Sequence, residues 1–403
     1  MAPQKDGEMP SYVYAIEESG ALRVYTTDGK DVAYLKHPRG YVKAVMDVFL
    51  PAGYPNSVTP DYTPYQIYDS LQAFSSTIAG LLSSRAVLQG FGVGDSTSSA
   101  TAAVLLTVLQ ESTGRLATIW FAHRCGRAIA PECKYYRFLA DIVNDLALLF
   151  DVLSPALPPP QKVAALCTAG ILRALCGVSG GASKAALSAH FAKTGNLAEL
   201  NAKDGSQETV ISLFGMLIGS LFLQVVHGKA AVWFWMVTLV SVHLWTNYQA
   251  VRAVQMRTLN KQRLCMVIDK LKHRVLRPDQ VAAEERIITW TKPNITFVDT
   301  VPTPLEIQRL NFEKYVKVGY LFLILPDEIK IYMKEGYSTR DVLRAYIEAY
   351  HIVHTRYEFS TGQPIDEYYD ELWKSLKAAG WDLETNAIET GPSIQLRLTH
   401  QKD

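Results

Sequence analysis

The sequence has few cysteines and little net charge. Its five cysteines contain no CxxC pair, and an odd number argues against a disulfide framework. A net charge of +1 gives no overall field that would recruit nucleic acid. The first ten residues include acidic side chains and no apolar run, so neither a secretory signal nor a typical transit peptide is visible. We therefore expect reduced, inert thiols and no nucleic-acid partner, and in a membrane protein an internal helix would direct insertion.

A catalytic or metal-binding signature is also lacking. The glycines between Gly90 and Gly94 have no preceding strand and no βαβ unit around them, which excludes a dinucleotide fingerprint. Ser183 and Lys184 lack a third group and an oxyanion hole, and His190 and His243 are lone histidines at the ends of apolar segments. We predict no catalytic residue and no metal ligand, rank an enzyme last, and leave the cofactor open.

The sequence does contain long apolar segments. Of its 403 residues 48% are hydrophobic, and the mean hydropathy is +0.03. The excess lies in six segments, namely residues 71–93, 100–122, 138–153, 163–189, 210–226 and 230–248. A span needs about 20 apolar residues, so the third segment is short. The prediction is a mainly α, multi-pass membrane helical bundle of about six spans; the alternative is a set of buried helices in a soluble bundle.

The charges between the segments favour the membrane. If the N-terminal region lies inside, the inner connections hold Arg124, Arg127, Lys134 and Arg137, then Lys184, Lys193 and Lys203, then Arg252, Arg257, Lys261 and Arg263. The outer connections hold only Lys162 and Lys229. This alternation is what the positive-inside rule predicts. We expect a multi-pass membrane location in an organelle that the sequence does not identify.

Three regions are predicted along the chain. Residues 1–70 read as a β-hairpin at 11–30 and a lead-in rich in proline and tyrosine, and residues 71–250 form the membrane core. Residues 251–403 begin with a basic helical continuation at 252–263 and then read as a small soluble α+β domain. Its expected elements are strands at 316–325, 329–333 and 393–398, a helix opened by Ser338 with Asp341 in its first turn, and a second helix at 365–379.

Small residues mark one expected helix contact. Gly177 and Gly181 begin a spacing of four, and Gly215 and Gly219 repeat that spacing in the next apolar segment. Closely approaching helices in lipid use small residues in this way. We predict that these two stretches pack against each other.

Ionisable residues inside the apolar segments form the candidate polar interface. The candidates are Glu111, Arg115, Asp141, Asp145 and Arg173, and Arg85 is a further ionisable residue within these segments. Glu111 and Arg115 are one helical turn apart, as are Asp141 and Asp145, so each pair shares a face. Each charge would be costly in lipid unless paired or hydrated. Two interpretations stay open: a polar pathway between helices, or buried ion pairs that fix helix register.

The polar stretch Lys203, Asp204, Gly205, Ser206, Gln207 and Glu208 reads as a loop that opens a helix. Asp204 and Gln207 have the spacing of a capping box, and Glu208 suits the first turn. A phosphate or carboxylate site at this helix start is the weaker alternative, because the acidic residues would repel an anion.

Several stretches together resemble the root UV-B-sensitive (RUS) family. They are LPAGYP at 50–55, LQAF at 71–74, GVG at 92–94, FLADI at 138–142, GGA at 180–182 and AKDGSQET at 202–209. The chain departs from the family pattern at Ser183 and Lys184, where Thr-Arg is usual. The resemblance implies a membrane-associated protein whose plant relatives are plastid proteins acting with a sister member. Without an evident transit peptide, a plastid address does not transfer.

The function predicted from these features is a transporter-like or small-molecule-handling membrane component of unestablished activity. The expected partners are the lipid bilayer and a homodimer or sister RUS protein that completes the pathway. The alternative function is a membrane-anchored scaffold whose C-terminal domain binds a partner protein.

Overall fold

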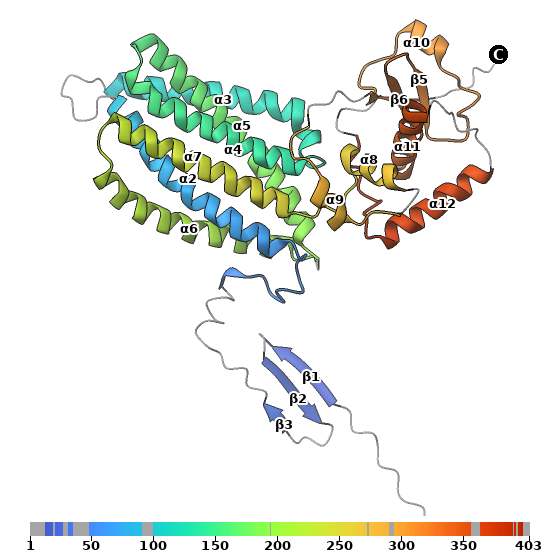
Figure 1. Cartoon of the computed structure of the whole chain (residues 1–403), viewed down its shortest axis with the longest axis horizontal. Helices are drawn as coiled ribbons and strands as arrows, with labels where there is room; N and C mark the ends of the chain where they lie inside the picture. The colour runs from blue at the N-terminus through green and yellow to red at the C-terminus, as the bar shows by residue number, and fades with distance from the viewer. Residues whose placement is uncertain are drawn as a thin grey trace, which may run out of the picture.

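The computed structural model describes residues 13–18, 21–26, 31–34, 48–90, 100–193, 195–271, 274–289, 294–355, 363–389, 391 and 394–397. Within them lies an elongated bundle of six long helices (Figure 1). These helices are α2 (Tyr62–Gly90), α3 (Ala100–Ile129), α4 (Cys133–Leu153), α5 (Pro159–Phe191), α6 (Leu197–Val225) and α7 (Lys229–Ala253). Each predicted apolar segment therefore corresponds to one helix.

The bounds of the helical region differ from the prediction at both of its ends. α2 begins at Tyr62, within the expected lead-in, because Pro64 stands in the first turn, where a missing N–H breaks no helical hydrogen bond. The residue 70 boundary thus falls inside a helix. α7 ends at Ala253, and residues 254–260 form a non-helical linker rather than the expected basic continuation.

The bundle has four inner helices and two outer ones. α4 packs on α2, α5 and α7, and α2 also packs on α7, while α3 packs mainly on α5 and α6 mainly on α2. Figure 1 shows α3 and α6 at opposite edges. The turn at 130–132, residues 192–193 and 195–196, and the start of the linker lie at the end that faces the C-terminal domain. The turns at 154–158 and 226–228 lie at the other end.

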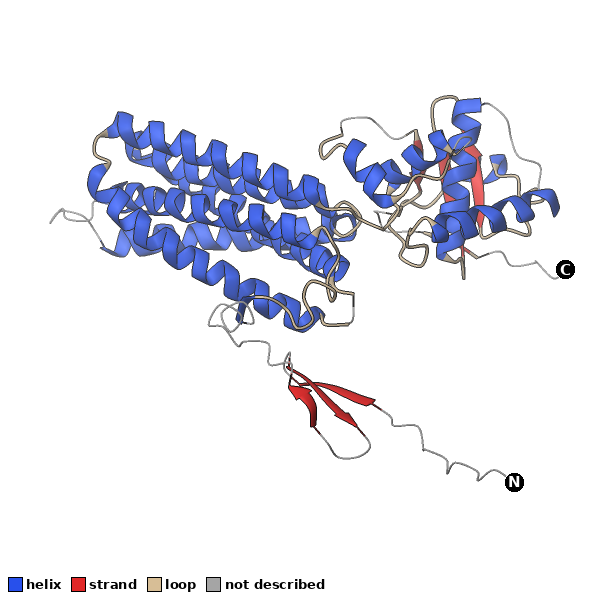
Figure 2. Cartoon of the chain, turned by 60° about the horizontal axis from the view of Figure 1, so that its bottom comes forward, coloured by secondary structure: helices blue, strands red, loops and turns tan. Residues whose placement is uncertain are grey.

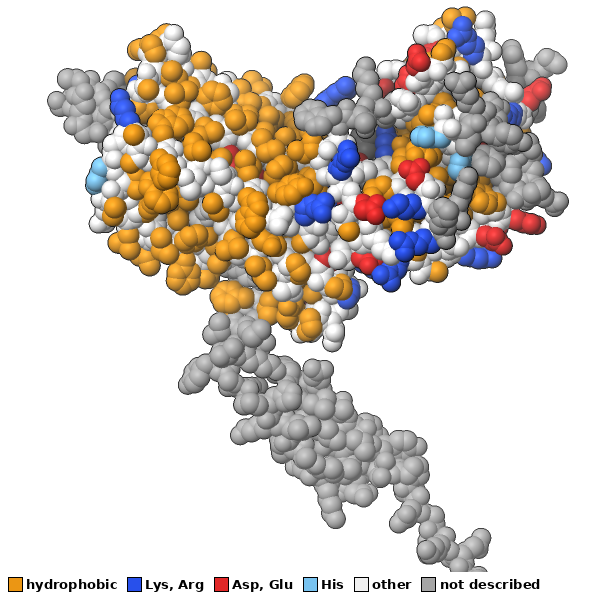
Figure 3. All heavy atoms as spheres, in the orientation of Figure 1, with side chains coloured by type: hydrophobic (Ala, Val, Ile, Leu, Met, Phe, Trp, Pro, Cys, Tyr) orange, Lys and Arg blue, Asp and Glu red, His pale blue; other side chains and the backbone are white. Residues whose placement is uncertain are grey.

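The outer surface of the bundle is strongly apolar (Figure 3). Leu116 and Trp120 of α3, Leu217 and Leu221 of α6 and Trp245 of α7 are all more than half exposed. α5 and α6 are long and apolar enough to cross a membrane, and no other helix of the described ranges passes that test. The two helices support membrane association, and the number of six spans stays a prediction.

Close helix approach occurs at glycines, but not between the predicted partners. A Cβ at Gly215 would lie 2.9 Å from the Cβ of Thr77, and one at Gly219 would lie 2.5 Å from Leu81 Cδ1, both on α2. Gly177 and Gly181 have no such neighbour within 4 Å. The expected contact of the α5 glycines with the α6 glycines is thus corrected: α6 uses its glycines to approach α2.

The C-terminal domain is α+β, as predicted. It contains α8 (Lys261–Lys270), α9 (Pro278–Glu284), β4 (Ile295–Phe297), α10 (Pro304–Arg309), β5 (Tyr320–Ile324), β6 (Ile329–Lys334), α11 (Thr339–Thr355), α12 (Gln363–Ala378) and β7 (Gln395–Leu396). β6 is central, antiparallel to β5 and parallel to β4 and β7. Ser338 and Asp341 form the expected reciprocal cap of α11. The sheet and α11 bury one apolar core that includes Tyr320, Ile331 and Ile347.

The N-terminal hairpin is confirmed and has a third strand. β1 (Val13–Glu18) pairs antiparallel with β2 (Ala21–Thr26), which pairs antiparallel with β3 (Asp31–Tyr34). Figure 2 shows this small sheet separate from the helical bundle.

The crossing of α3 and α5 gives the first prediction. A Cβ at Gly170 would lie 2.9 Å from the carbonyl oxygen of Gln110, whereas one at Gly181 on the same helix meets open space. We expect Gly170→Ala to destabilise the protein by about 1–3 kcal/mol because the helices must separate. Gly181→Ala should stabilise it by about 0.5–1 kcal/mol through helix propensity. Thermal unfolding of the detergent-solubilised variants measures both, and equal midpoints would contradict the close crossing.

Candidate functional site

Polar side chains gather in the middle of the apolar bundle. We call them the central cluster: Asp69 and Gln72 of α2, Arg137, Asp141 and Asp145 of α4, and His243 and Asn247 of α7. The side chain of Arg137 is 11% exposed, and the other six residues are buried. Three helices that are distant in sequence therefore meet through charge inside the bundle.

Arg137 connects α4 to α2. Its guanidinium lies 2.9 Å from Asp69 Oδ1 and 2.9 Å from Asp141 Oδ1. Arg137 and Asp141 are one turn apart on α4, so the helix itself aligns them. The planar guanidinium donates to both carboxylates at once, and this is the geometry for which arginine is suited.

His243 connects α7 to α4. Its Nδ1 lies 2.8 Å from Asp145 Oδ2, and its Nε2 lies 3.6 Å from Asp141 Oδ2. The imidazole therefore stands between the two carboxylates that the sequence places on one helix face. Histidine carries a proton with an ordinary pKa near neutrality and is a common member of intramembrane proton relays.

Two amides complete the central cluster. Asn247 Nδ2 donates to Asp141 Oδ2 at 2.5 Å and to Gln72 Oε1 at 2.8 Å, and Gln72 Nε2 donates to Asp141 as well. Asp141 thus accepts from Arg137, Gln72 and Asn247. By contrast, Asp145 Oδ1 accepts no hydrogen bond from the described residues. Asp145 is the carboxylate with spare acceptor capacity.

The charges of the central cluster do not balance. Asp69, Asp141 and Asp145 supply three carboxylates, against one guanidinium and one imidazole. With all three acids ionised, a negative charge remains whether or not His243 is protonated. An uncompensated charge in an apolar interior is costly, and the central cluster holds more carboxylates than its guanidinium and imidazole can pair with.

Arg173 and Arg85, two of the ionisable residues singled out in the sequence, lie elsewhere in the bundle. Arg173 of α5 pairs with the buried Asp151 of α4, which also accepts from Ser83 Oγ at 2.7 Å. Arg85 donates to the carbonyl oxygens of Leu223 and Val226, each at 3.0 Å, at the end of α6. These contacts fix helix positions.

Glu111 and Arg115 are outside the central cluster. They pair with each other at 3.5 Å on the outer face of α3, with side chains 64% and 81% exposed. The expectation that Glu111 and Arg115 line one polar interface with Asp141 and Asp145 is therefore corrected. The reason is the packing of α3, which contacts the bundle mainly through α5.

The polar stretch 203–208 is helical rather than a loop. α6 begins at Leu197 with Asn196 before it, so Asp204, Gly205 and Ser206 stand well inside the helix. Asp204 is buried, accepts from Gln66, and lies 2.9 Å from Lys184, which is also 2.7 Å from Glu208. The expected capping role of Asp204 is wrong.

The same stretch holds the segment before α2 in place. Gln207 Nε2 donates to the carbonyl oxygen of Phe49 at 2.6 Å. Lys203 Nζ donates to the carbonyl oxygen of Val48 at 3.1 Å. The family-motif residues of α6 therefore join α6 to α5, α2 and the residues that lead into α2.

A buried ion triad joins the bundle to the C-terminal domain. Glu285 Oε2 lies 2.6 Å from Lys134 Nζ, and Glu285 Oε1 lies 2.8 Å from Arg263 Nε. Burial alone would raise the pKa of the Glu285 carboxyl, but the charges of Arg263 and Lys134 hold that pKa below its ordinary value. Lys134 is thus a structural residue of α4, not the loop charge that the sequence suggested.

Sequence reasoning missed Arg137, Asp69, His243 and Asn247. Arg137 was counted with the loop charges, although its spacing to Asp141 and Asp145 places all three on one face of a helix. His243 was interpreted as a lone histidine because its partner Asp145 is 98 residues away in the chain. No local pattern in the sequence could have connected them.

Comparison with known proteins identifies the family. Residues 35–274 match the family model described as "Vitamin B6 photo-protection and homoeostasis domain". The chain is 31% identical over 368 residues to "Protein root UVB sensitive 3" of Arabidopsis thaliana, covering 85% of this chain and 83% of that protein. The chain belongs to the root UVB sensitive (RUS) family. This RUS protein is also 37% identical over 255 residues to "RUS family member 1" of Dictyostelium discoideum, covering 62% of the chain and 48% of that relative. No solved structure matches the RUS chain.

The low pKa of Glu285 predicts an acid-sensitive junction. A carboxyl whose folded-state pKa is lowered stabilises the fold above its unfolded pKa, and that stabilisation is lost as the pH falls through the folded value. We expect Glu285→Gln to lower the free energy of unfolding at pH 7 by about 3–5 kcal/mol. The difference should shrink once the pH falls below about 4.3.

The control is Glu284→Gln, which removes an exposed carboxylate that pairs with Lys270 and should cost at most about 1 kcal/mol. Thermal midpoints measured from pH 7 down to about pH 2, which passes through the lowered folded-state pKa, test both variants. A constant difference between wild type and Glu285→Gln across this range would contradict the assignment.

Proposed function

We propose that this RUS protein is a multi-pass membrane protein that handles a small molecule, with α2 to α7 spanning the bilayer and the central cluster acting as its proton-coupling centre. The distribution of side chains supports insertion: leucine, phenylalanine and tryptophan are exposed on the outer helices, while aspartate, arginine and histidine are buried between the inner ones. Lipid favours this arrangement, because it solvates apolar side chains and leaves ionisable groups to face the bundle interior.

The observation that carries the proposal is His243 between Asp141 and Asp145. A purely structural ion pair needs one positive and one negative group. Arg137 with either Asp69 or Asp141 would form such a pair. The additional carboxylate and the imidazole instead form a group that changes its protonation at modest cost. Carboxylate and histidine pairs of this kind serve proton relays in pumps and transporters.

The description of the family model suggests the first small molecules to test. It names vitamin B6, whose forms are small pyridine derivatives with or without a phosphate. We therefore propose the forms of vitamin B6 as candidate substrates.

We further propose that two copies, or this chain and a sister RUS protein, associate through α3. Leu105, Leu116, Ile119 and Trp120 expose an apolar face around the Glu111 and Arg115 pair. An exposed ion pair is costly in contact with lipid. A twofold axis along the membrane normal places two α3 helices in parallel, so that Glu111 of one copy approaches Arg115 of its partner.

Proton coupling predicts a specific loss of uptake. Proteoliposomes that contain the wild-type protein should accumulate labelled pyridoxine faster under an inward proton gradient than without one. Asp145→Asn keeps the shape of the side chain and removes the titrating group, so we expect at least a tenfold loss of the gradient-driven component with a preserved thermal midpoint. His243→Gln is a second variant that tests the same relay.

Glu284→Gln is the control, because it removes an exposed carboxylate outside the central cluster and outside the α3 face and should leave uptake unchanged. Gradient-driven uptake that survives in both Asp145→Asn and His243→Gln would show that the central cluster is purely structural. Absence of uptake by the wild type would reject transport of pyridoxine.

The α3 interface predicts selective cross-linking. In a variant whose native cysteines are replaced, Leu116→Cys should form disulfide-linked dimers under mild oxidation in the membrane. Leu217→Cys on α6 is the control, since its side chain is 61% exposed against 69% for Leu116. Dimers of equal yield at both positions, or at neither, would contradict association through α3.

A further inference from the structure

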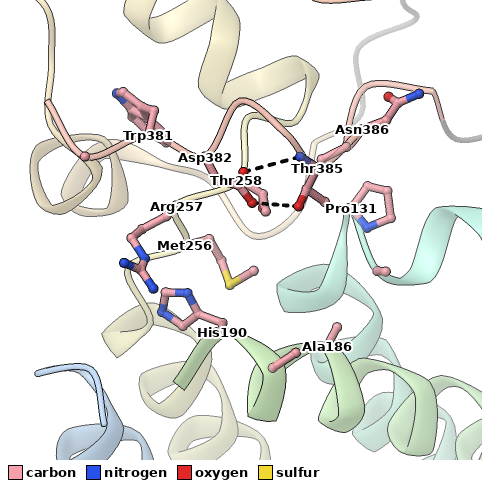
Figure 4. A pocket seen from close by; sticks show the side chains of 14 residues that line it. Pro131, Ala186, His190, Met256, Arg257, Thr258, Trp381, Asp382, Thr385 and Asn386 are labelled. Atoms are coloured by element: carbon pink, nitrogen blue, oxygen red, sulfur yellow. Dashed lines mark hydrogen bonds between the residues drawn. The ribbon is translucent and has the colours of Figure 1, made fainter. Parts of the chain in front are cut away.

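A cavity of about 470 Å³ lies where the bundle meets the C-terminal domain (Figure 4). Four segments line it: the turn after α3, the last turn of α5, the linker after α7, and the loop after α12. Backbone bonds hold two of these walls together, because Asp382 N donates to the carbonyl oxygen of Arg257 at 2.9 Å. The volume is within the range of small-molecule sites.

The acidic groups beside this cavity are already occupied. Asp382 accepts from the backbone N–H groups of Glu384 and Thr385 and from Thr385 Oγ1 at 2.6 Å. Burial alone would raise the pKa of Asp382, but these hydrogen bonds and the charge of Arg257 lower it. Asp61 Oδ2 lies 2.9 Å from Nε2 of His190, which lines the cavity, and accepts from Gln255 N at 2.6 Å. Both carboxylates are therefore engaged by groups of the protein.

The donor capacity is concentrated at Arg257. Its side chain is exposed at the cavity and makes no hydrogen bond or ion pair with the described residues. Figure 4 shows Arg257 and His190 on the same side of the cavity. A guanidinium with free donors binds carboxylate or phosphate groups through paired hydrogen bonds.

The side of the wall that the bundle supplies is apolar and made of small residues. Pro131, Ala186 and Ala189 face the cavity from the bundle, and the buried Met256 faces it from the linker. Small side chains leave room for a ligand, and methionine adapts its shape to what it contacts. The wall therefore suits a compact organic body rather than a bare inorganic ion.

From these contacts we infer that the cavity between the bundle and the C-terminal domain binds a small organic anion, with its carboxylate or phosphate on Arg257 and its body against Met256 and Ala189. The bound molecule bridges both parts of the chain and so stabilises their junction. The inference rests on the proposed function only in the choice of vitamin B6 forms as probes.

Three probes with the same ring separate charge from shape: pyridoxine has no anionic group, 4-pyridoxic acid has a carboxylate, and pyridoxine 5′-phosphate has a phosphate. Titration calorimetry on the full chain in detergent should detect the two anions and find pyridoxine at least tenfold weaker. Inorganic phosphate should also bind more weakly than pyridoxine 5′-phosphate, because it makes no contact with the apolar wall.

Two variants alter the cavity independently. Arg257→Gln removes the charge, and we expect a loss of affinity of about 10-fold to 100-fold, as is typical for hydrogen bonds to charged groups. Ala189→Leu fills the cavity from an exposed helix position and should weaken binding to a similar extent. Arg274→Gln, an exposed arginine away from the cavity, is the control and should bind like the wild type.

The expected result is that both anions bind and that Arg257→Gln and Ala189→Leu each weaken this binding. A bound anion should also slow proteolysis of the linker at 254–260. Failure of both anions to bind, or equal binding by wild type, Arg257→Gln and Ala189→Leu, would overturn the assignment. Binding that is detected only to the phosphate headgroup of phosphatidic acid in vesicles, and not to the two soluble anions, would also overturn the assignment. Binding is measured at equilibrium without a membrane gradient, so its outcome is separate from that of the uptake assay.

Discussion

The fold of the bundle depends on the burial of charge between α2, α4 and α7. Arg137 holds Asp69 and Asp141 from two helices, and His243 brings in the third through Asp145. Removing Arg137 would leave Asp69 and Asp141 as unpaired charges in an apolar interior, at a cost of several kcal/mol. This requirement fixes the relative register of the inner helices. Within the central cluster, Asp145 has a second oxygen that accepts no hydrogen bond from the described residues.

The outer helices depend on different physics. α3 and α6 approach the inner helices where glycine removes a side chain, at Gly170 of α5 opposite Gln110 and at Gly215 and Gly219 of α6 opposite α2. Their remaining surface is apolar and exposed. Polar contacts thus organise the interior, close backbone packing attaches the periphery, and the apolar exterior is left for lipid or a partner chain. The central cluster and the cavity at Arg257 lie at different depths, the first between helices and the second at the end of the bundle.

The sequence predicts the parts of this structure that are local. Continuous apolar segments locate all six helices, and the Ser338 and Asp341 pair locates the start of α11. It does not predict contacts between distant segments. Asp145 and His243 are 98 residues apart, and the partner of Lys134 is 151 residues away. The 203–208 stretch was misjudged for a related reason: its polar residues resemble a helix start, but tertiary partners such as Gln66 and Lys184 satisfy them inside α6. The α5 glycines also show that spacing alone does not identify the partner helix.

The most direct test of membrane insertion is carbonate extraction combined with labelling of single cysteines at Arg124, Gln161, Lys193 and His227, which are exposed positions near alternating ends of the bundle. The account predicts that the protein stays in the membrane pellet. It also predicts that the cysteines at Arg124 and Lys193 are labelled from one side of the membrane, and those at Gln161 and His227 from the other. Release into the supernatant, or labelling of all four positions from one side, would contradict it and would make the helices the core of a soluble bundle.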